Sequence, residues 1–130
     1  MGHYLLDTHT AMWFFNGDNA ISENARRVII DLSNVKYLSI VSAWELAIKI
    51  GLGKLEFNSR SAGFIRLAEK NGFSILPIKH FHLTALETLS FLHRDPFDRL
   101  LIATAIAEEL TLITVDENIA RYEVSQIWQF

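Results

Sequence analysis

The chain has 130 residues, of which 50% are hydrophobic and 21% charged, so we expect one globular domain spanning residues 1–130. The absence of cysteine excludes disulfides and cysteine-ligated zinc and predicts a cytoplasmic protein, and no apolar run approaches the ~20 residues that cross a bilayer, so no membrane association is expected. The net charge of -3 excludes nucleic-acid binding by bulk charge and leaves that task to local basic residues and bound cations.

Short β-rich runs alternate with helical patterns along the chain. In order, we expect a strand at 4–6, a helical turn or two at 10–15, a helix at 22–32, a strand at 35–41, a helix from 42 to 51 or 53, a helix at 59–70, a strand at 73–78, a helix at 81–89, a helix at 96–110, a strand at 111–115, a short helix at 117–121 and a strand at 124–128. This alternation predicts an α/β fold with a central parallel sheet of about five strands and helices on both faces.

Acidic residues fall at one edge of this predicted sheet. Asp7 directly follows the first strand, Asp116 directly follows the fourth, and Glu45 lies in the first turn of the helix after the second strand. Because parallel strands point their carboxyl ends the same way, these three side chains belong to the edge where α/β sheets bind ligands. Asp98 opens the helix that precedes the fourth strand, and whether it joins them depends on the path of residues 93–97.

Carboxylates that meet at such an edge need a cation or a proton. Two of them ~4 Å apart repel by ~4 kcal/mol at an effective dielectric constant near 20. Several carboxylates without cysteine suit hard divalent ions such as Mg²⁺ or Mn²⁺. An ion of this kind would hold a phosphate oxygen and lower the pKa of a bound water for attack on phosphorus.

Each acid also has a purely structural interpretation. Glu45 stands three residues after Ser42, which is the spacing of a capping box. Asp95 precedes Pro96, so it fits a helix cap followed by proline in the first turn. Asp7 and Asp116 fit residues that cap helices or stabilise turns. Spacing alone leaves the structural interpretation and the metal site both open.

Four segments together resemble the PIN-domain family, and especially the VapC-type toxins of prokaryotic toxin–antitoxin pairs. These segments are LLDTHT at residues 5–10, SIVSAWEL at 39–46, DPFDRLLIATA at 95–105 and LITVD at 112–116. No single segment is specific, but the four occur in the family's order and span almost the whole chain. The resemblance implies a three-layer α/β/α domain that cleaves RNA with Mg²⁺ or Mn²⁺, forms a homodimer and is neutralised by a cognate antitoxin.

The resemblance also assigns roles to residues. The acids that would bind metal and carry out catalysis are Asp7, Glu45, Asp98 and Asp116. Thr8 and Thr114 become candidates for hydrogen bonding to these acids or for positioning water. Asp95 is a second acid close to Asp98 and could share its role, although the stretch that begins at Asp98 matches the family spacing better.

Basic residues near these segments are candidates for contacts with RNA phosphates. They are Lys49, Arg94 and Arg99. Lys49 lies four residues after Glu45, so the plainer interpretation of Lys49 is a surface ion pair on one helix face. His9, two positions after Asp7, is a further candidate for reaching the substrate.

Aromatic residues provide the candidate partner contacts. Trp13, Phe14 and Phe15 are consecutive, and three consecutive side chains cannot all face one side of a helix. We therefore expect at least one of them, with Trp13 and Phe14 as candidates, to be exposed or covered by an antitoxin or a second subunit. Trp44 is expected in the core beside the acids.

Other functions remain open from the sequence. One is a PIN-type nuclease that acts in RNA processing or on structured DNA. Another is a catalytically silent interaction module, in which the acids are caps and the aromatic residues bind a partner. A receiver-type signalling domain shares the α/β alternation but needs paired acids after the first strand and a lysine after the last; here Thr8 follows Asp7 and no such lysine is present.

Overall fold

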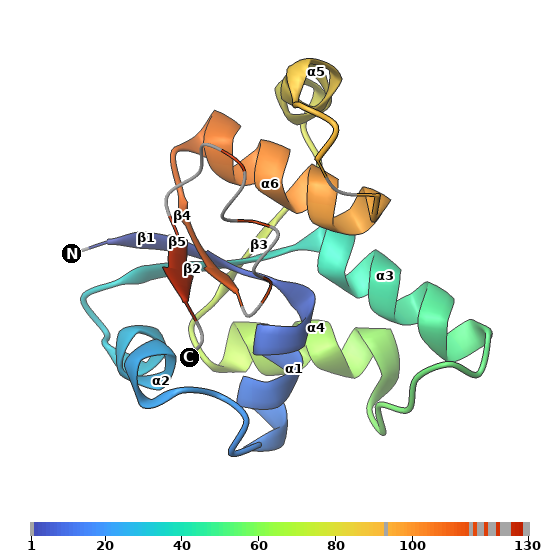
Figure 1. The fold of residues 1–130 in the computed structure, drawn as a ribbon. Helices are drawn as coiled ribbons and strands as arrows, with labels where there is room; N and C mark the ends of the chain where they lie inside the picture. The colour runs from blue at the N-terminus through green and yellow to red at the C-terminus, as the bar shows by residue number, and fades with distance from the viewer. Residues whose placement is uncertain are drawn as a thin grey trace.

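The computed structural model describes residues 2–92, 94–114, 116, 119 and 122 and the backbone of 126–128. Its centre is one parallel sheet with the strand order β3-β2-β1-β4-β5 (Figure 1). The strands are β1 (His3–Leu6), β2 (Val35–Ser39), β3 (Ser74–Leu76), β4 (Thr111–Thr114) and β5 (Gln126–Trp128). The expected parallel sheet of about five strands is confirmed.

Helices cover both faces of the sheet and make the three layers. They are α1 (Thr8–Asn16), α2 (Glu23–Ile30), α3 (Ile40–Gly51), α4 (Arg60–Lys70), α5 (His80–Thr88) and α6 (Pro96–Glu108). In Figure 1, α1, α2 and α4 lie on one face, while α6 lies on the other and carries α5 on its outer side. Within the part of the chain that is described, no helix has the length and apolarity needed to cross a membrane.

Two apolar clusters fill the spaces between the layers. Successive side chains of a strand point to opposite faces, so Leu5 and Leu6 enter different clusters although both are fully buried. Leu6 joins the cluster that contains Phe64 of α4, and Leu5 joins the cluster that contains Leu101 of α6. Burial on both faces explains why the strands read as continuous apolar runs.

The junction between β2 and α3 differs from the sequence prediction. The strand ends at Ser39 and the helix begins at Ile40, because the Ser39 hydroxyl accepts a hydrogen bond of 3.0 Å from the Val41 amide and caps the helix there. The β-branched Ile40 and Val41 favoured a longer strand in the sequence. The predicted capping box from Ser42 is therefore wrong, and Glu45 lies in the second turn of α3.

Two further predictions differ from the structure. The helix expected to reach residue 32 ends at Ile30, and Leu32 beyond it is 94% exposed. Trp44, expected in the core, is 52% exposed with its ring against that of Phe97. Several predictions fall outside the described residues: Val115, most of the short helix at 117–121, and the start of the last strand at 124–125.

A buried histidine joins α5 to α6. His82 is fully buried, and its Nδ1 accepts a hydrogen bond of 3.1 Å from the Lys79 amide. Its Nε2 lies 2.9 Å from Glu108 Oε1 on α6, and Lys79 Nζ lies 3.1 Å from the same oxygen. Because Nδ1 accepts, Nε2 carries the ring proton and donates it to Glu108.

Candidate functional site

Asp7 lies at the junction of β1 and α1 and is only 5% exposed. Its Oδ1 accepts a hydrogen bond of 2.8 Å from the Thr10 amide and so caps α1, and its Oδ2 accepts a hydrogen bond of 2.5 Å from the Thr114 hydroxyl. Burial raises the pKa of Asp7, and the hydrogen bonds from Thr114 and Thr10 and the charge of His9 offset part of this rise. The structural interpretation as a cap is therefore correct, and it leaves Asp7 at the carboxyl edge of the sheet.

Thr114 connects Asp7 to Asp116. β1 and β4 are parallel neighbours with Leu6 opposite Ile113, so the residues that follow the two strands come together. The Asp116 amide donates a hydrogen bond of 3.0 Å to Thr114 Oγ1, whose own proton goes to Asp7. One hydroxyl thus fixes Asp7 relative to the backbone of Asp116.

Thr8 makes the corresponding connection to α3. Glu45 is 3% exposed, and its Oε1 accepts a hydrogen bond of 2.7 Å from the Thr8 hydroxyl, which also lies 2.9 Å from Ser42 Oγ. Lys49 Nζ lies 2.5 Å from Glu45 Oε2, which confirms the predicted ion pair, although Glu45 is buried and the pair does not lie wholly on the surface. The first residue of α1 therefore orients the carboxylate on α3.

The acids at the start of α6, Asp95 and Asp98, lie near enough to Lys49 for their charges to act on it. Asp95 caps α6, accepting hydrogen bonds of 2.9 and 3.1 Å from the amides of Phe97 and Asp98, as its spacing before Pro96 predicted. The pKa of Lys49 is raised, first by the hydrogen bond to Glu45 and then by the charges of Glu45, Asp95 and Asp98. The negative charge of Asp98 therefore acts on the lysine that neutralises Glu45.

These side chains match a hard divalent cation in chemistry, because the donors are carboxylate and hydroxyl oxygens. Within the described ranges, however, no three or more Asp, Glu or His side chains lie close enough together to hold a metal ion. The structure instead joins Asp7 to Asp116 through Thr114, and places the Lys49 ammonium on Glu45.

The candidate RNA-binding arginines and the candidate partner-binding aromatic residues lie in different parts of the fold. Arg99 donates a hydrogen bond of 2.9 Å to the Ser90 carbonyl and stacks on the Phe91 ring, so its guanidinium is directed to the segment before α6. Arg94 is exposed. Trp13 and Phe14 are half-buried against the core cluster on their side of the sheet.

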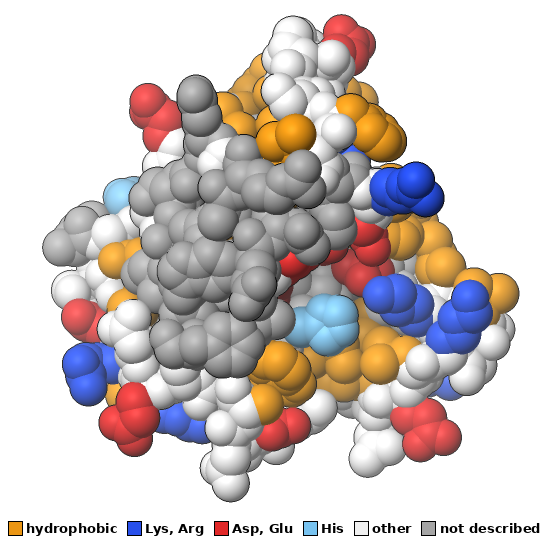
Figure 2. Space-filling view, viewed as in Figure 1, with side chains coloured by type: hydrophobic (Ala, Val, Ile, Leu, Met, Phe, Trp, Pro, Cys, Tyr) orange, Lys and Arg blue, Asp and Glu red, His pale blue; other side chains and the backbone are white. Residues whose placement is uncertain are grey.

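A pocket of about 200 Å³ lies beside the acids, between α1, α3 and the turn after α3. Its lining comprises Thr8, His9, Met12, Glu45, Leu46, Lys49, Lys54 and Leu55. Figure 2 shows red acidic side chains at a hollow in this face, with a pale blue histidine and two blue basic side chains beside them. Lys54, Met12 and Leu55 were not expected from the sequence, which gave no signal that they meet.

The protein is a parallel α/β domain with buried acids at the carboxyl edge of its sheet, and known proteins share its fold. Residues 4–124 match the family model described as PIN domain, and the chain therefore belongs to the PIN domain family. PIN domains as a family are nucleases. No match to the sequence is found among curated proteins.

Solved structures share the fold at low sequence identity. VapBC2 from Rickettsia felis, bound to a DNA fragment from its promoter, has a TM-score of 0.74 and 18% identity, covering 98% of this chain and 99% of that chain. DNA-bound VapBC from Salmonella typhimurium has a TM-score of 0.73 and 15% identity, with both chains covered to 100%. FitAcB from Neisseria gonorrhoeae has a TM-score of 0.63 and 18% identity, covering 95% and 96%.

Proposed function

We propose that this protein is a metal-dependent endoribonuclease, the toxin component of a toxin–antitoxin pair of the VapC type. It hydrolyses RNA phosphodiester bonds with a water activated by carboxylate-bound Mg²⁺ or Mn²⁺. The observation that carries the proposal is the pairing, in a PIN domain, of Asp7 with Asp116 through Thr114, next to a Glu45 that Thr8 orients.

The residues that would hold the cation are Asp7, Glu45, Asp98 and Asp116. When bound, a divalent cation lowers the pKa of water and polarises a phosphate oxygen. Thr8 and Thr114 hold the carboxylates of Glu45 and Asp7 in fixed orientations. Because no three of the described acids lie within range of one ion, binding a cation would draw these side chains together. Lys49 lies on the far oxygen of Glu45, where its charge can attract the RNA backbone.

The test is cleavage of single-stranded RNA by the wild type and by Asp98→Asn in Mn²⁺. We expect the variant to lose cleavage while keeping its fold, and Glu87→Gln, which removes an exposed acid on α5, to cleave normally. Mn²⁺ should also raise the melting temperature of the wild type, because an ion that binds only the folded state stabilises it. Undiminished cleavage by Asp98→Asn would remove this residue from the mechanism.

The same assay separates this function from its alternatives. A nuclease of RNA processing or of structured DNA would prefer tRNA or flapped DNA over unstructured RNA when the three are compared side by side. A catalytically silent interaction module would bind a partner tightly without metal-dependent hydrolysis of any of them. Preference for single-stranded RNA together with metal dependence supports the proposed toxin activity.

The proposal includes a cognate antitoxin, one domain over residues 1–130 and a cytoplasmic location. The structures named above, which contain VapBC and FitAcB, support a partner protein. Trp13 and Phe14, half-buried on α1, are the candidate contacts. Co-expression with a small neighbouring reading frame should relieve the growth arrest that the toxin causes.

We also propose a homodimer that uses the exposed face of α3. Trp44 and Ile48 of α3 and its C-cap residue Leu52 follow at intervals of four, so they share one side of the helix and its end, and they are 52%, 37% and 64% exposed. An apolar stripe of this kind is typical of an interface. Light scattering should find a dimer for the wild type and a monomer for Leu52→Glu. A monomeric wild type would contradict the proposed dimer and leave the proposed nuclease activity unaffected.

A further inference from the structure

The pocket beside the acids has one basic wall. Lys49 and Lys54 both line it, and Lys49 is joined to Glu45 by the ion pair described above. An ammonium group has three N–H donors, so Lys49 can bind a phosphate oxygen while it stays on Glu45. In a chain of net charge -3, this pair is a local concentration of positive charge next to the acids.

A glycine turn places the second lysine next to the first. The Gly53 amide donates to the Ile50 carbonyl at 3.0 Å and the Lys54 amide donates to the Lys49 carbonyl at 2.9 Å, which is the hydrogen-bond pattern of a Schellman motif. Gly53 has a φ of +70°, the left-handed conformation that this motif requires. The turn brings Lys54 back beside the last turn of α3.

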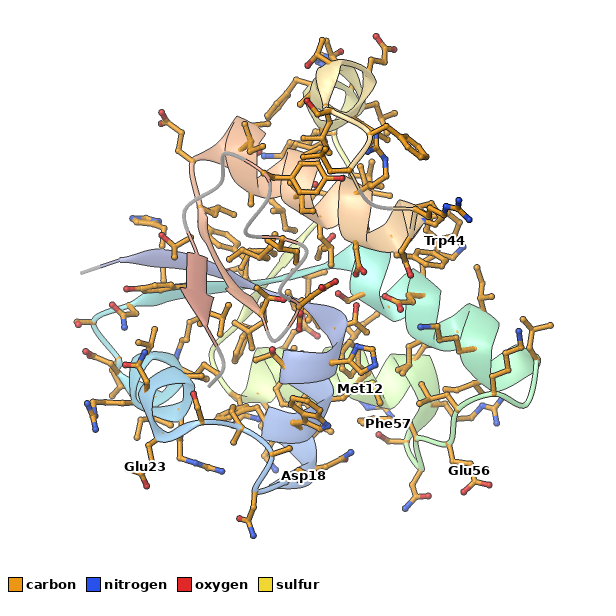
Figure 3. All side chains as sticks on the ribbon, in the orientation of Figure 1. Met12, Asp18, Glu23, Trp44, Glu56 and Phe57 are labelled. Atoms are coloured by element: carbon orange, nitrogen blue, oxygen red, sulfur yellow. The ribbon has the colours of Figure 1, made fainter. Side chains whose placement is uncertain are left out.

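Other side chains that line the pocket are apolar or aromatic. Met12 projects from α1 toward α3 and α4 (Figure 3), and Leu46 and Leu55 line the pocket from α3 and from the segment after the turn. His9 of α1 also lines the pocket, and its ring lies 6.3 Å from that of Trp13. Side chains of this kind suit a flat, uncharged group, and the imidazole ring offers it a stacking surface.

Both halves of a nucleotide therefore find matching surfaces in one pocket. The phosphate matches the two ammonium groups, the base matches His9 and Met12, and Thr8 and Glu45 at the pocket edge belong to the acid site itself. A nucleotide held here lies directly beside the bond that the acids would cut. Stacking and backbone charge are the two contributions by which proteins hold single strands without reading their sequence.

We propose that this pocket is the substrate subsite for the nucleotide adjoining the cleaved bond of single-stranded RNA. Lys49 and Lys54 bind its phosphate, and its base lies against His9 and Met12. The subsite rests on the proposed function, because it deepens the assignment of RNA as the substrate. It adds Lys54, in the turn after α3, to the candidate RNA contacts, and it gives His9 of α1, already a candidate from the sequence, a stacking role.

The test measures binding separately from cleavage. A short fluorescein-labelled single-stranded RNA is titrated with protein, with calcium in place of the catalytic cation, and its anisotropy is followed at several salt concentrations. Lys54→Gln should weaken binding about fivefold at about 0.1 M salt and lower the slope of log affinity against log salt by ~0.7, the value for one phosphate contact on a single strand. Lys54→Arg should retain most of the affinity, and Lys70→Gln, an exposed lysine on α4 away from the pocket, should bind like the wild type.

His9 provides an independent arm of the experiment. His9→Ala should weaken binding roughly tenfold without changing the salt slope, because it removes a stacking surface and no phosphate contact. His9→Phe keeps an aromatic ring and should restore the affinity. The subsite requires two results. His9→Ala must lower the affinity with an unchanged salt slope, and Lys54→Gln must lower the affinity with a reduced salt slope.

The subsite and the nuclease proposal fail in different ways. If the wild type binds and cleaves RNA while Lys54→Gln and His9→Ala bind it normally, the subsite is rejected and the ribonuclease stands. If the wild type neither binds nor cleaves RNA, both are rejected. If the wild type cleaves RNA but shows no measurable binding in calcium, steady-state kinetics replaces the binding assay. An unchanged KM for Lys54→Gln and for His9→Ala then rejects the subsite, and a raised KM with unchanged kcat supports it.

Discussion

Thr114 and Asp7 lie 107 residues apart in the chain, and the Thr114 hydroxyl donates a hydrogen bond to Asp7 Oδ2 across the pairing of β4 with β1. Both residues are almost fully buried. The hydrogen bond therefore stabilises a carboxylate that burial alone would disfavour, and it favours the charged form that a cation needs.

Replacing Thr114 by Val should lower the free energy of unfolding by about 2 kcal/mol at neutral pH. Valine keeps the shape but removes the hydrogen bond to Asp7 Oδ2, and hydrogen bonds to charged groups contribute roughly this much. Denaturant unfolding at pH 7 measures the effect. Thr114→Ser retains the hydroxyl and should lose much less. Equal stability of Thr114→Val and the wild type would show that the hydrogen bond is unimportant for Asp7.

Asp7→Asn should make the protein more stable at neutral pH, even though it abolishes the proposed cleavage. The pKa of Asp7 is raised above its ordinary value of 3.8, so the unfolded chain releases this proton more readily than the folded one. Asp7 therefore costs no stability below pH 3.8, and its cost grows as the pH rises toward the folded pKa and stays constant above it. Asparagine removes the cost. Melting temperatures at pH 7 and near pH 4 measure the change, which should shrink at the lower pH.

Asp31→Asn is a matched comparison, in which the expected change in stability at neutral pH has the opposite sign. Hydrogen bonds from the Ser33 hydroxyl and amide lower the pKa of this fully exposed carboxyl. Its contribution is present above pH 3.8 and is lost as the pH falls through the lowered value, so Asp31→Asn should lower the melting temperature at neutral pH. A loss of stability in Asp7→Asn as well would mean that the hydrogen bonds of Asp7 outweigh its burial.

The sequence was sufficient to place Asp7 and Asp116 at the same edge, because both follow apolar strands and neighbouring parallel strands end together. It was insufficient where local signals compete. Ser39 and Ser42 are both able to cap a helix, and the β-branched residues between them favoured the wrong one. The position of Glu45 along its helix shifted accordingly.

The pocket depended on tertiary packing that no local pattern encodes. Met12 and Lys54 meet only because α1 packs on α3 and because the turn at Gly53 returns the chain. The burial of His82 against Glu108 likewise follows from the way α5 lies on α6. In each case the contact joins two segments distant in the sequence, and the local sequence pattern of neither segment indicates the contact.

Glu108→Gln should loosen α5 from α6. The hydrogen bond from His82 is the main cause that lowers the pKa of Glu108 below 4.5, and Lys79 contributes as well. The stabilisation is therefore present above pH 4.5 and is lost as the pH falls through the lowered pKa. At neutral pH we expect a loss of roughly 1 kcal/mol, because the oxygen is partly solvated.

Amide hydrogen exchange within α5 is the direct measurement for this variant, since exchange reports local opening. Protection in α5 should fall in Glu108→Gln more than protection in β1. Glu109→Gln, the exposed neighbour at the end of α6, is the control and should leave exchange unchanged. Similar losses in both variants would point to the end of α6 rather than to the pair of Glu108 with His82.

Lys49→Gln should bind Mn²⁺ more tightly than the wild type when RNA is absent. The Lys49 ammonium neutralises Glu45 and is attracted by Asp95 and Asp98, so removing it leaves more negative charge where the proposed cation binds. Because Lys49 is about one-third exposed, solvent screens part of this charge, and a three- to tenfold gain in affinity is a rough expectation.

Calorimetric titration with Mn²⁺ measures this gain, with Lys70→Gln as the control for a general change in net charge. The same Lys49 variant should bind RNA more weakly, because its ammonium is also one of the two phosphate contacts. Tighter metal binding combined with weaker RNA binding is difficult to obtain from a folding defect, which would weaken both. Weaker Mn²⁺ binding in Lys49→Gln would mean that the lysine supports the acid site instead of competing with the cation for Glu45.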